Sequence, residues 1–329
     1  MNTHRRWASV LVASLGLGLG VGLAPAEAVS PAAAAAGAEV SFGPRGSTDP
    51  RVAKLAQGRR PRPGVAPTGT VMPKPPVQLP AALDRRAGYA AQNTCDPTDK
   101  PGSVAYGQLL KSIWPKGVVG ISRSCTESGT SEHKDGRAVD FMINAAVPEQ
   151  KKIADDIVAW ITADNGAIAR RLGVMYLIWN RKIWGIYNAE AGWQPYSGVS
   201  PHTDHIHTSL TWDGAFKRTS WWTGVALTTW DEGPCRVYAG ELAPIYTARN
   251  IDDCAPLKSA PKTTHASAVL GTSSADVTAA QRLLGAPVTG KFDYATWQVV
   301  RAWQALKTIP VTGVLDQVTW SILDPASKR

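Results

Sequence analysis

The chain has 329 residues, of which 44% are hydrophobic and 19% charged, and its formal net charge at pH 7 is +9. This content excludes a wholly disordered chain, and the length suits about two domains. Residues 1–86 contain eleven Lys or Arg and four Asp or Glu, so they carry most of the positive charge. Because the remainder is nearly balanced, we expect no nucleic-acid partner.

Residues 1–28 have the features of a signal peptide. Two arginines precede an apolar run from Trp7 to Leu23, and Ala26-Glu27-Ala28 satisfies the small-x-small rule for signal peptidase. A retained membrane anchor is the alternative, but the run is short and rich in glycine for a membrane span. We therefore expect a secreted protein with no stable membrane insertion after signal cleavage.

Residues 29–88 form a basic segment rich in Ala, Pro and Arg. Because it has little hydrophobic periodicity and cannot bury a core, we expect it to be disordered or extended. Its charge can attract polyanions such as teichoic acids. A solvated tether with no specific partner explains the same composition and is favoured.

Residues 89–254 contain the elements of an α+β domain. Apolar positions predict helices at 104–113 and after Pro148, and strands at 117–123 and 174–179. We expect a small antiparallel sheet that carries the site described below, with helices packed on it.

A first polar cluster occupies residues 131–140, with the sequence Ser-Glu-His-Lys-Asp-Gly-Arg-Ala-Val-Asp. Gly136 suits a sharp turn that brings His133 back over the strand that follows. From Ala138 onward, branched and aromatic residues alternate with others, so a strand here buries the apolar set and turns Asp140 to the opposite face.

Five aromatic residues lie between this cluster and the next: Trp179, Trp184, Tyr187, Trp193 and Tyr196. They can line a substrate cleft or belong to the core. At this density aromatic residues are more often core, so we favour the core.

A second cluster, at 202–207, has the sequence His-Thr-Asp-His-Ile-His. Alternate residues of a strand share a face, so His205 and His207 can face one cavity while Ile206 faces a core. Clusters of His with Asp hold catalytic zinc in many proteins. Two His ligands and one carboxylate leave zinc with an open position, where it can acidify water and polarise a carbonyl. An unmetallated polar loop is the alternative.

Four cysteines in an exported chain indicate two disulfides. Of the three pairings, Cys95 with Cys125 and Cys235 with Cys254 keep both loops local. A zinc site made by these cysteines is disfavoured, because there is no Cys-x-x-Cys pair.

The C-terminal part contains an internal repeat with an offset of 23 residues. Residues 287–297 recur as 310–320, and Gln281 and Gln304 precede the two copies by the same distance. Each copy predicts a Thr-Gly turn followed by a helix that an aspartate, Asp293 or Asp316, caps. Three short helices are expected: 277–284, 293–306 and 316–323.

This repeat resembles the three-helix peptidoglycan-binding domain found on many wall hydrolases. The resemblance implies an all-α domain at 266–329, joined through a linker at 255–265 that contains two prolines. Peptidoglycan would then be the anchor of the protein.

The two polar clusters also carry a resemblance. Ser131-x-His133-x-x-Gly136-x-Ala138-x-Asp140 resembles the first motif of the zinc D-Ala-D-Ala carboxypeptidases. The later His-x-His pair resembles the closing motif of the wider lysostaphin, D-Ala-D-Ala metallopeptidase and hedgehog superfamily.

The resemblance implies that His133, Asp140 and His207 bind zinc. It also implies that His205 acts as general base or stabilises the tetrahedral intermediate. His202 lies five positions before His207. It resembles a further active-site histidine of the murein endopeptidases in this superfamily.

The closing motif departs from that of the carboxypeptidases, which have Glu-x-x-Trp-His with Glu as the base. This chain has His205-Ile206-His207 after Asp204, so bond specificity does not transfer, and Asp204 is better suited to orient a histidine. Those enzymes also hold substrate with an Arg ahead of the first motif, and Arg123 occupies a comparable place.

Together these features predict a secreted, wall-associated, monomeric zinc peptidase. Its substrate would be amide bonds in peptidoglycan stem or cross-link peptides, cleaved as a D,D-carboxypeptidase or an endopeptidase. The alternative is a non-catalytic cell-wall-binding protein with a structural or regulatory zinc site.

Overall fold

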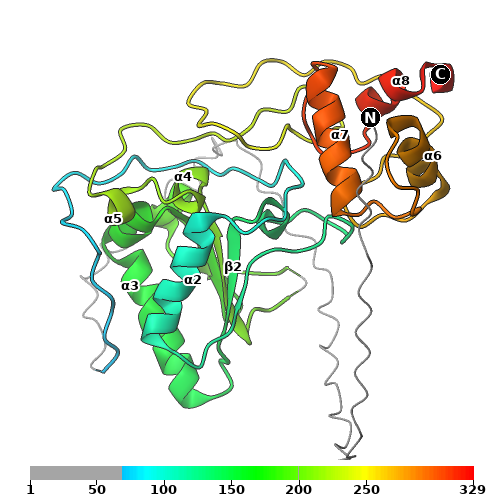
Figure 1. Cartoon of the computed structure of the whole chain (residues 1–329). Coiled ribbons are helices and arrows are strands. Elements are labelled where there is room, and N and C mark those ends of the chain that lie inside the picture. Colours follow the sequence, from blue (N-terminus) through cyan, green and yellow to red (C-terminus); the bar gives the residue numbers. More distant parts are fainter. Residues whose placement is uncertain (1–68, 199) are drawn as a thin grey trace, which may run out of the picture. The chain divides into compact units, whose positions relative to one another are not determined.

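The computed structural model describes residues 69–198 and 200–329 (Figure 1). The expected signal peptide and residues 29–68 of the expected basic segment lie outside the described residues. Within the described part, no helix combines the length and apolar character needed to cross a membrane.

The fold is α+β, as expected, and is built on a sheet of six antiparallel strands. In sheet order the strands are β1 (Val119–Gly120), β2 (Ala138–Met142), β6 (His205–Leu210), β3 (Val174–Trp179), β4 (Lys182–Gly185) and β5 (Gln194–Pro195). The position of β6 between β2 and β3 brings both polar clusters to neighbouring strands. The strand expected at 117–123 is shorter in the structure, because only Val119 and Gly120 pair with β2.

Two long helices belong to this part, α2 (Pro101–Ile113) and α3 (Pro148–Leu172), and both begin with proline, whose fixed φ suits a first turn (Figure 1). The backbone of α3 leaves helical geometry at residues 163–166. A Cβ on Gly166, whose φ is +79°, would lie 2.6 Å from the Trp184 ring, so only glycine suits this break. Shorter helical segments are η1 (Glu132–Asp135), η2 (Ile186–Ala191), α4 (Trp212–Ala215) and α5 (Ser220–Thr223).

The core lies between the sheet and these helices. Val139 and Phe141 of β2 and Ile206 of β6 are fully buried, in one cluster with residues of α2 and α3 such as Leu110 and Ile157. The alternation predicted for β2 and β6 is therefore confirmed. It leaves the intervening polar residues of both strands on the opposite face of the sheet.

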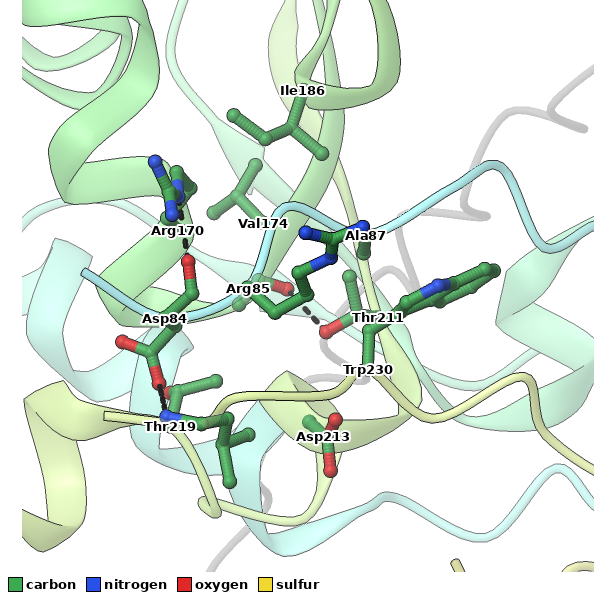
Figure 2. A pocket seen from close by; sticks show the side chains of 12 residues that line it. Asp84, Arg85, Ala87, Arg170, Val174, Ile186, Thr211, Asp213, Thr219 and Trp230 are labelled. Atoms are coloured by element: carbon green, nitrogen blue, oxygen red, sulfur yellow. Dashed lines mark hydrogen bonds between the residues drawn. The ribbon is translucent and has the colours of Figure 1, made fainter. Parts of the chain in front are cut away.

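Residues 69–88 differ from the expectation of an unpacked segment. The carboxylate of Asp84 is buried and accepts hydrogen bonds from the backbone N–H groups of Ser220 at 3.0 Å and Leu227 at 3.1 Å. Arg170 of α3 donates to the Asp84 carbonyl at 2.6 Å (Figure 2). These contacts hold the end of the Pro-rich segment against the domain, and a cavity of about 20 Å³ lies beside them.

The C-terminal region is helical, with α6 (Ala275–Leu284), α7 (Tyr294–Leu306), α8 (Gln317–Leu323) and the short η3 (Pro325–Ser327). As predicted, Asp293 caps α7 and Asp316 caps α8, each by accepting from the backbone N–H of the threonine three residues later. The three expected helices are confirmed within two residues at each end.

Each copy of the repeat has a glutamine that makes the same set of hydrogen bonds. Gln281 is fully buried; it donates to Thr296 Oγ1 at 2.9 Å and accepts from the backbone N–H of Gly290 at 2.9 Å. Gln304 makes the equivalent bonds to Thr319 and Gly313 at 2.9 Å each. Each glutamine thus joins its Thr-Gly turn to the first turn of the next helix.

Candidate metal centre

The first polar cluster forms a tight turn that leads into β2. The helical turn η1 ends at Gly136, which has φ +68° and lies so close to Thr98 that a Cβ would be 2.0 Å from its carbonyl oxygen. Only glycine can occupy this position. The turn buries His133, which is 1% exposed, under the strand that carries Asp140.

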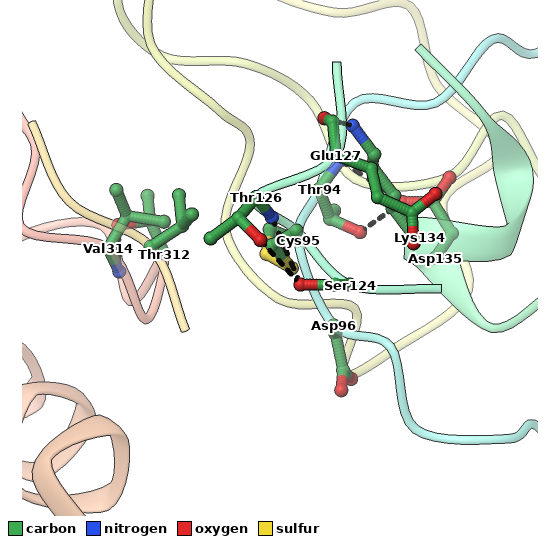
Figure 3. The surroundings of a disulfide bond; sticks show 12 residues. Thr94, Cys95, Asp96, Ser124, Thr126, Glu127, Lys134, Asp135, Thr312 and Val314 are labelled. Carbon is green, nitrogen blue, oxygen red and sulfur yellow. Dashed lines mark hydrogen bonds between the residues drawn. A yellow bond between two sulfur atoms is a disulfide. The ribbon is translucent and has the colours of Figure 1, made fainter. Parts of the chain in front are cut away.

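A disulfide braces this turn. Cys95 is bonded to Cys125, and Cys235 to Cys254, so both expected pairings are present. Next to Cys95, Thr94 donates through its backbone N–H to Asp135 at 3.2 Å (Figure 3). The backbone N–H of Asp96 donates to the Lys134 carbonyl at 3.0 Å. The bridge therefore joins residues 94–96, which are hydrogen-bonded to η1, to the loop at Cys125.

The pairing of β2 with β6 brings the candidate ligands together. Asp140 is the register partner of His207. Asp140 Oδ1 lies 2.9 Å from His207 Nδ1 and 3.2 Å from His133 Nε2, and the two histidine nitrogens are 3.3 Å apart. Among the described residues, these three form a buried group whose ligand atoms all lie within 4.8 Å of one another.

The donor set fits a divalent cation. Nδ1 of His133 faces the carbonyl oxygen of Ile121, which can only accept, so Nδ1 donates and Nε2 offers a lone pair to the group. Burial lowers the pKa of His207 despite the neighbouring Asp140 carboxylate, which favours its neutral ring. Two neutral imidazoles and one carboxylate are a common ligand set for zinc.

Asp140 supplies the negative charge of the group. Its outer oxygen, Oδ2, accepts a hydrogen bond at 2.8 Å from Arg123, whose side chain is 36% exposed. Arg123 therefore lies beside the candidate ligand, with part of its side chain exposed.

His205 lies next to the group. Its Nδ1 donates to Asp204 Oδ1 at 2.8 Å, so Asp204 orients this ring, as its position in the sequence suggested. The opposite nitrogen, Nε2, is buried, has no hydrogen-bond partner among the described residues, and lies 3.5 Å from Asp140 Oδ1. His205 is thus placed to exchange a proton with a molecule at the centre.

His202 approaches the same place from the loop before β6. Its backbone has φ +49°, and its Nδ1 donates to the Ser200 carbonyl at 2.7 Å. Its ring centroid is 4.7 Å from that of His205 and 5.6 Å from that of His207. Burial lowers the pKa of His202 to about 3, so this ring is neutral at pH 7 and its Nε2 is an acceptor.

The five aromatic residues between the clusters divide between core and site. Trp179 and Trp184 belong to the core cluster, Trp193 packs against it, and Tyr187 packs against a second buried cluster that contains Tyr176. Tyr196 contacts the His202 ring edge-on at a centroid distance of 5.2 Å. An open pocket of about 330 Å³ is lined by Trp179, Trp193 and residues of α3, so it lies on the helix side of the sheet, away from the candidate ligands.

The sequence analysis missed a polar network beneath His207. Ser209 Oγ lies 3.0 Å from His207 Nε2 and donates to Glu132 Oε2 at 3.3 Å. Tyr176 donates to the same oxygen at 2.7 Å, and its ring stacks on His207. The first motif does not specify the residue at position 132, and the contact of Glu132 with Ser209 depends on β6 lying beside η1.

Comparison with known protein families adds two matches. The model of the VldE C-terminal domain matches residues 96–207, a range that contains all six candidate site residues. A peptidoglycan-binding domain model matches residues 273–323. No curated protein and no solved structure matches the chain.

The second match supports a peptidoglycan-binding C-terminal domain and an association with the cell wall. Together with the two disulfides, it is consistent with an extracellular or cell-wall location. The VldE match bears on neither the metal nor the reaction.

Proposed function

We propose that this protein is a secreted zinc-dependent peptidase that hydrolyses amide bonds in the stem or cross-link peptides of peptidoglycan. One observation carries the proposal. His133, Asp140 and His207 converge in a buried group, and His205 points an unpartnered nitrogen toward it. Three convergent ligands beside a separate base are the arrangement that hydrolytic zinc sites need.

The C-terminal domain supports the choice of substrate. A wall-binding module keeps a tethered enzyme at high local concentration on an insoluble polymer. In this proposal residues 89–254 form the catalytic domain, 255–265 the linker and 266–329 the anchor. The protein acts as a monomer after residues 1–28 are removed.

His205 is the proposed general base. When bound, zinc would supply a Lewis acid that polarises the scissile carbonyl and acidifies water. Because the Nδ1 proton of His205 is held by Asp204, Nε2 is free to accept the proton of the attacking water. The same nitrogen can then return the proton to the leaving amine.

His202 and Arg123 have different roles in this proposal. Neutral His202 keeps its proton on Nδ1, so its Nε2 accepts a hydrogen bond from water or a substrate N–H. Arg123 is always charged and partly exposed, and it can donate to the developing oxyanion while it holds Asp140.

One observation favours a second candidate, a non-catalytic wall-binding protein with a structural zinc site. His205 Nε2 lies only 3.5 Å from Asp140 Oδ1, and a fourth protein ligand would close the site. Against this, the convergent group of ligand atoms within 4.8 Å does not include His205. We therefore favour the catalytic function.

The experiment is digestion of purified peptidoglycan by the zinc-loaded mature protein, with His205→Ala as the comparison and products identified by mass. We expect cleavage by the wild type and a rate about 10²- to 10⁴-fold lower for the variant, the usual contribution of a general base. Release of free D-Ala would indicate a carboxypeptidase, and opened cross-links an endopeptidase. Binding to peptidoglycan with no cleavage would favour the structural-zinc candidate.

A further inference from the structure

The ring of His207 lies between two buried carboxyl groups on opposite sides. Asp140 Oδ1 is 2.9 Å from Nδ1, on the side of the candidate metal ligands. On the other side, Ser209 Oγ is 3.0 Å from Nε2, and Glu132 lies beyond the serine. A neutral imidazole carries one proton, so the two sides compete for it.

The direction of the hydrogen bonds decides which nitrogen carries the proton. Ser209 has a single hydroxyl hydrogen, which it donates to Glu132 Oε2 at 3.3 Å. In this arrangement the Ser209 oxygen accepts from His207, which places the ring proton on Nε2. Nδ1 is left with a lone pair that faces Asp140 and His133.

Glu132 is held in place for this task. It is 1% exposed, and Tyr176 donates to the oxygen that also accepts from Ser209, at 2.7 Å. Arg137 lies 3.8 Å from the other carboxylate oxygen and provides a buried positive charge. These partners balance the cost of burying a carboxylate at this position.

We propose that Glu132 is a positioning residue that acts through Ser209 to keep the proton of His207 on Nε2, so that Nδ1 is available to a metal ion. The proposal rests on the zinc site of the proposed function. Partners beyond the ligands are known to fix the tautomer and basicity of metal-binding histidines. Here the chain is imidazole, hydroxyl and carboxylate, and it is supplied by η1 and β6.

The first test measures the tautomer in the full-length, metal-free protein by ¹⁵N NMR of the histidine rings. In the wild type we expect His207 to be protonated on Nε2. In Ser209→Ala the proton should also populate Nδ1, where Asp140 accepts it. A wild-type proton on Nδ1, or a tautomer that does not respond to the substitution, would overturn the proposal.

The second test measures zinc dissociation constants by competition with a chelator for Ser209→Ala, Glu132→Gln and the double variant. Each single substitution should weaken zinc binding about 10- to 100-fold, the usual effect of losing such a partner. Because the two residues act in series, the double variant should bind zinc as well as the single variant with the larger loss of affinity. Additive losses of zinc affinity in the double variant would contradict the proposal that Glu132 acts through Ser209.

Asp156→Asn is the control. Asp156 is a buried carboxylate of α3 that pairs with Lys152 at 2.8 Å, and the structure shows contacts of its side chain with Lys152 and Thr70, away from η1 and Ser209. We expect this variant to keep the wild-type tautomer and zinc affinity within about threefold, well below the loss from removing a partner of a ligand. If Glu132→Gln fails to fold, Ser209→Ala still decides the matter.

The two tests also separate this proposal from the proposed function. If the wild type binds no zinc, the zinc peptidase is wrong, but the NMR measurement still shows whether Glu132 and Ser209 control the His207 tautomer. If zinc binds equally well to all variants, the positioning role fails and the peptidase proposal stands.

Discussion

Asp140 of β2 lies directly opposite His207 of β6, with 2.9 Å between Oδ1 and Nδ1. Two residues that are 67 positions apart in the chain are therefore brought together by strand register alone. A slip of the pairing by one residue would turn one of them to the helix-covered face and destroy the group. The candidate metal centre is for this reason a property of the sheet, and not of either motif alone.

Asp140→Asn keeps the shape of the side chain and removes its charge. We expect zinc affinity to fall by more than about 100-fold, because loss of a ligand should exceed the 10- to 100-fold loss typical of an outer partner. Chelator competition on the folded variant measures this. An unchanged dissociation constant would exclude Asp140 as a ligand.

Arg123→Lys should separate two roles of this arginine. Lysine keeps a positive charge near Asp140 but cannot hold the carboxylate and an oxyanion with one planar group. We expect kcat on peptidoglycan fragments to fall about 10²- to 10³-fold, the effect of losing an oxyanion donor. Arg86→Gln, which removes an arginine from a partly exposed pair with Glu190, is the control and should leave kcat unchanged. Equal kcat in wild type and Arg123→Lys would remove Arg123 from the reaction.

The two disulfides should differ in their effect on the metal site. Replacing either pair by serine should lower the free energy of unfolding by about 2–4 kcal/mol. Only the Cys95–Cys125 pair braces the turn that carries His133, so only its loss should also weaken zinc binding. The Cys235–Cys254 variant is the matched control. Calorimetry and zinc titration on the same samples test both statements, and equal zinc affinity in the two variants would contradict the bracing role.

His265 should make the C-terminal region pH-sensitive. Burial lowers its pKa, but hydrogen bonds to Asp276 at 2.7 Å and Asp324 at 2.9 Å outweigh burial and raise the pKa above 6.5. A group whose pKa is higher in the folded than in the unfolded state stabilises the fold when it is protonated. This contribution is complete at pH values below the unfolded pKa and is lost as the pH rises through the folded pKa. Removing the imidazole should therefore matter most in acid.

The measurement is hydrogen exchange in α6 and α8, corrected for intrinsic rates, in wild type and His265→Asn. We expect the variant to lose protection at about pH 5.5 and to differ little at about pH 8.5, because the wild-type histidine is then neutral. A larger loss at the higher pH would show that the charged pair does not stabilise this region.

Local patterns in the sequence predicted much of the fold. The alternation around Asp140 and around Ile206 predicted which face each strand buries, because a half-buried strand has a period of two. The 23-residue repeat predicted the caps at Asp293 and Asp316, because a cap depends only on residues a few positions apart in the sequence.

What the sequence could not predict depends on distant partners. Asp84 lies in a Pro-rich stretch and is ordered by Ser220, 136 positions away. The partners of His265 cannot be inferred from its neighbours, because Asp324 is 59 positions further along. Glu132 and Ser209 are ordinary residues in isolation and form a chain only when η1 meets β6.

The most direct test of the account is the zinc content of full-length mature protein after equilibrium dialysis, compared among wild type, His207→Ala and His205→Ala. We predict about one zinc per wild-type chain, none in His207→Ala and about one in His205→Ala, because a catalytic site has three protein ligands and a separate base. Loss of zinc from both variants would make His205 a fourth ligand and the site structural. A wild type without zinc would contradict the account altogether.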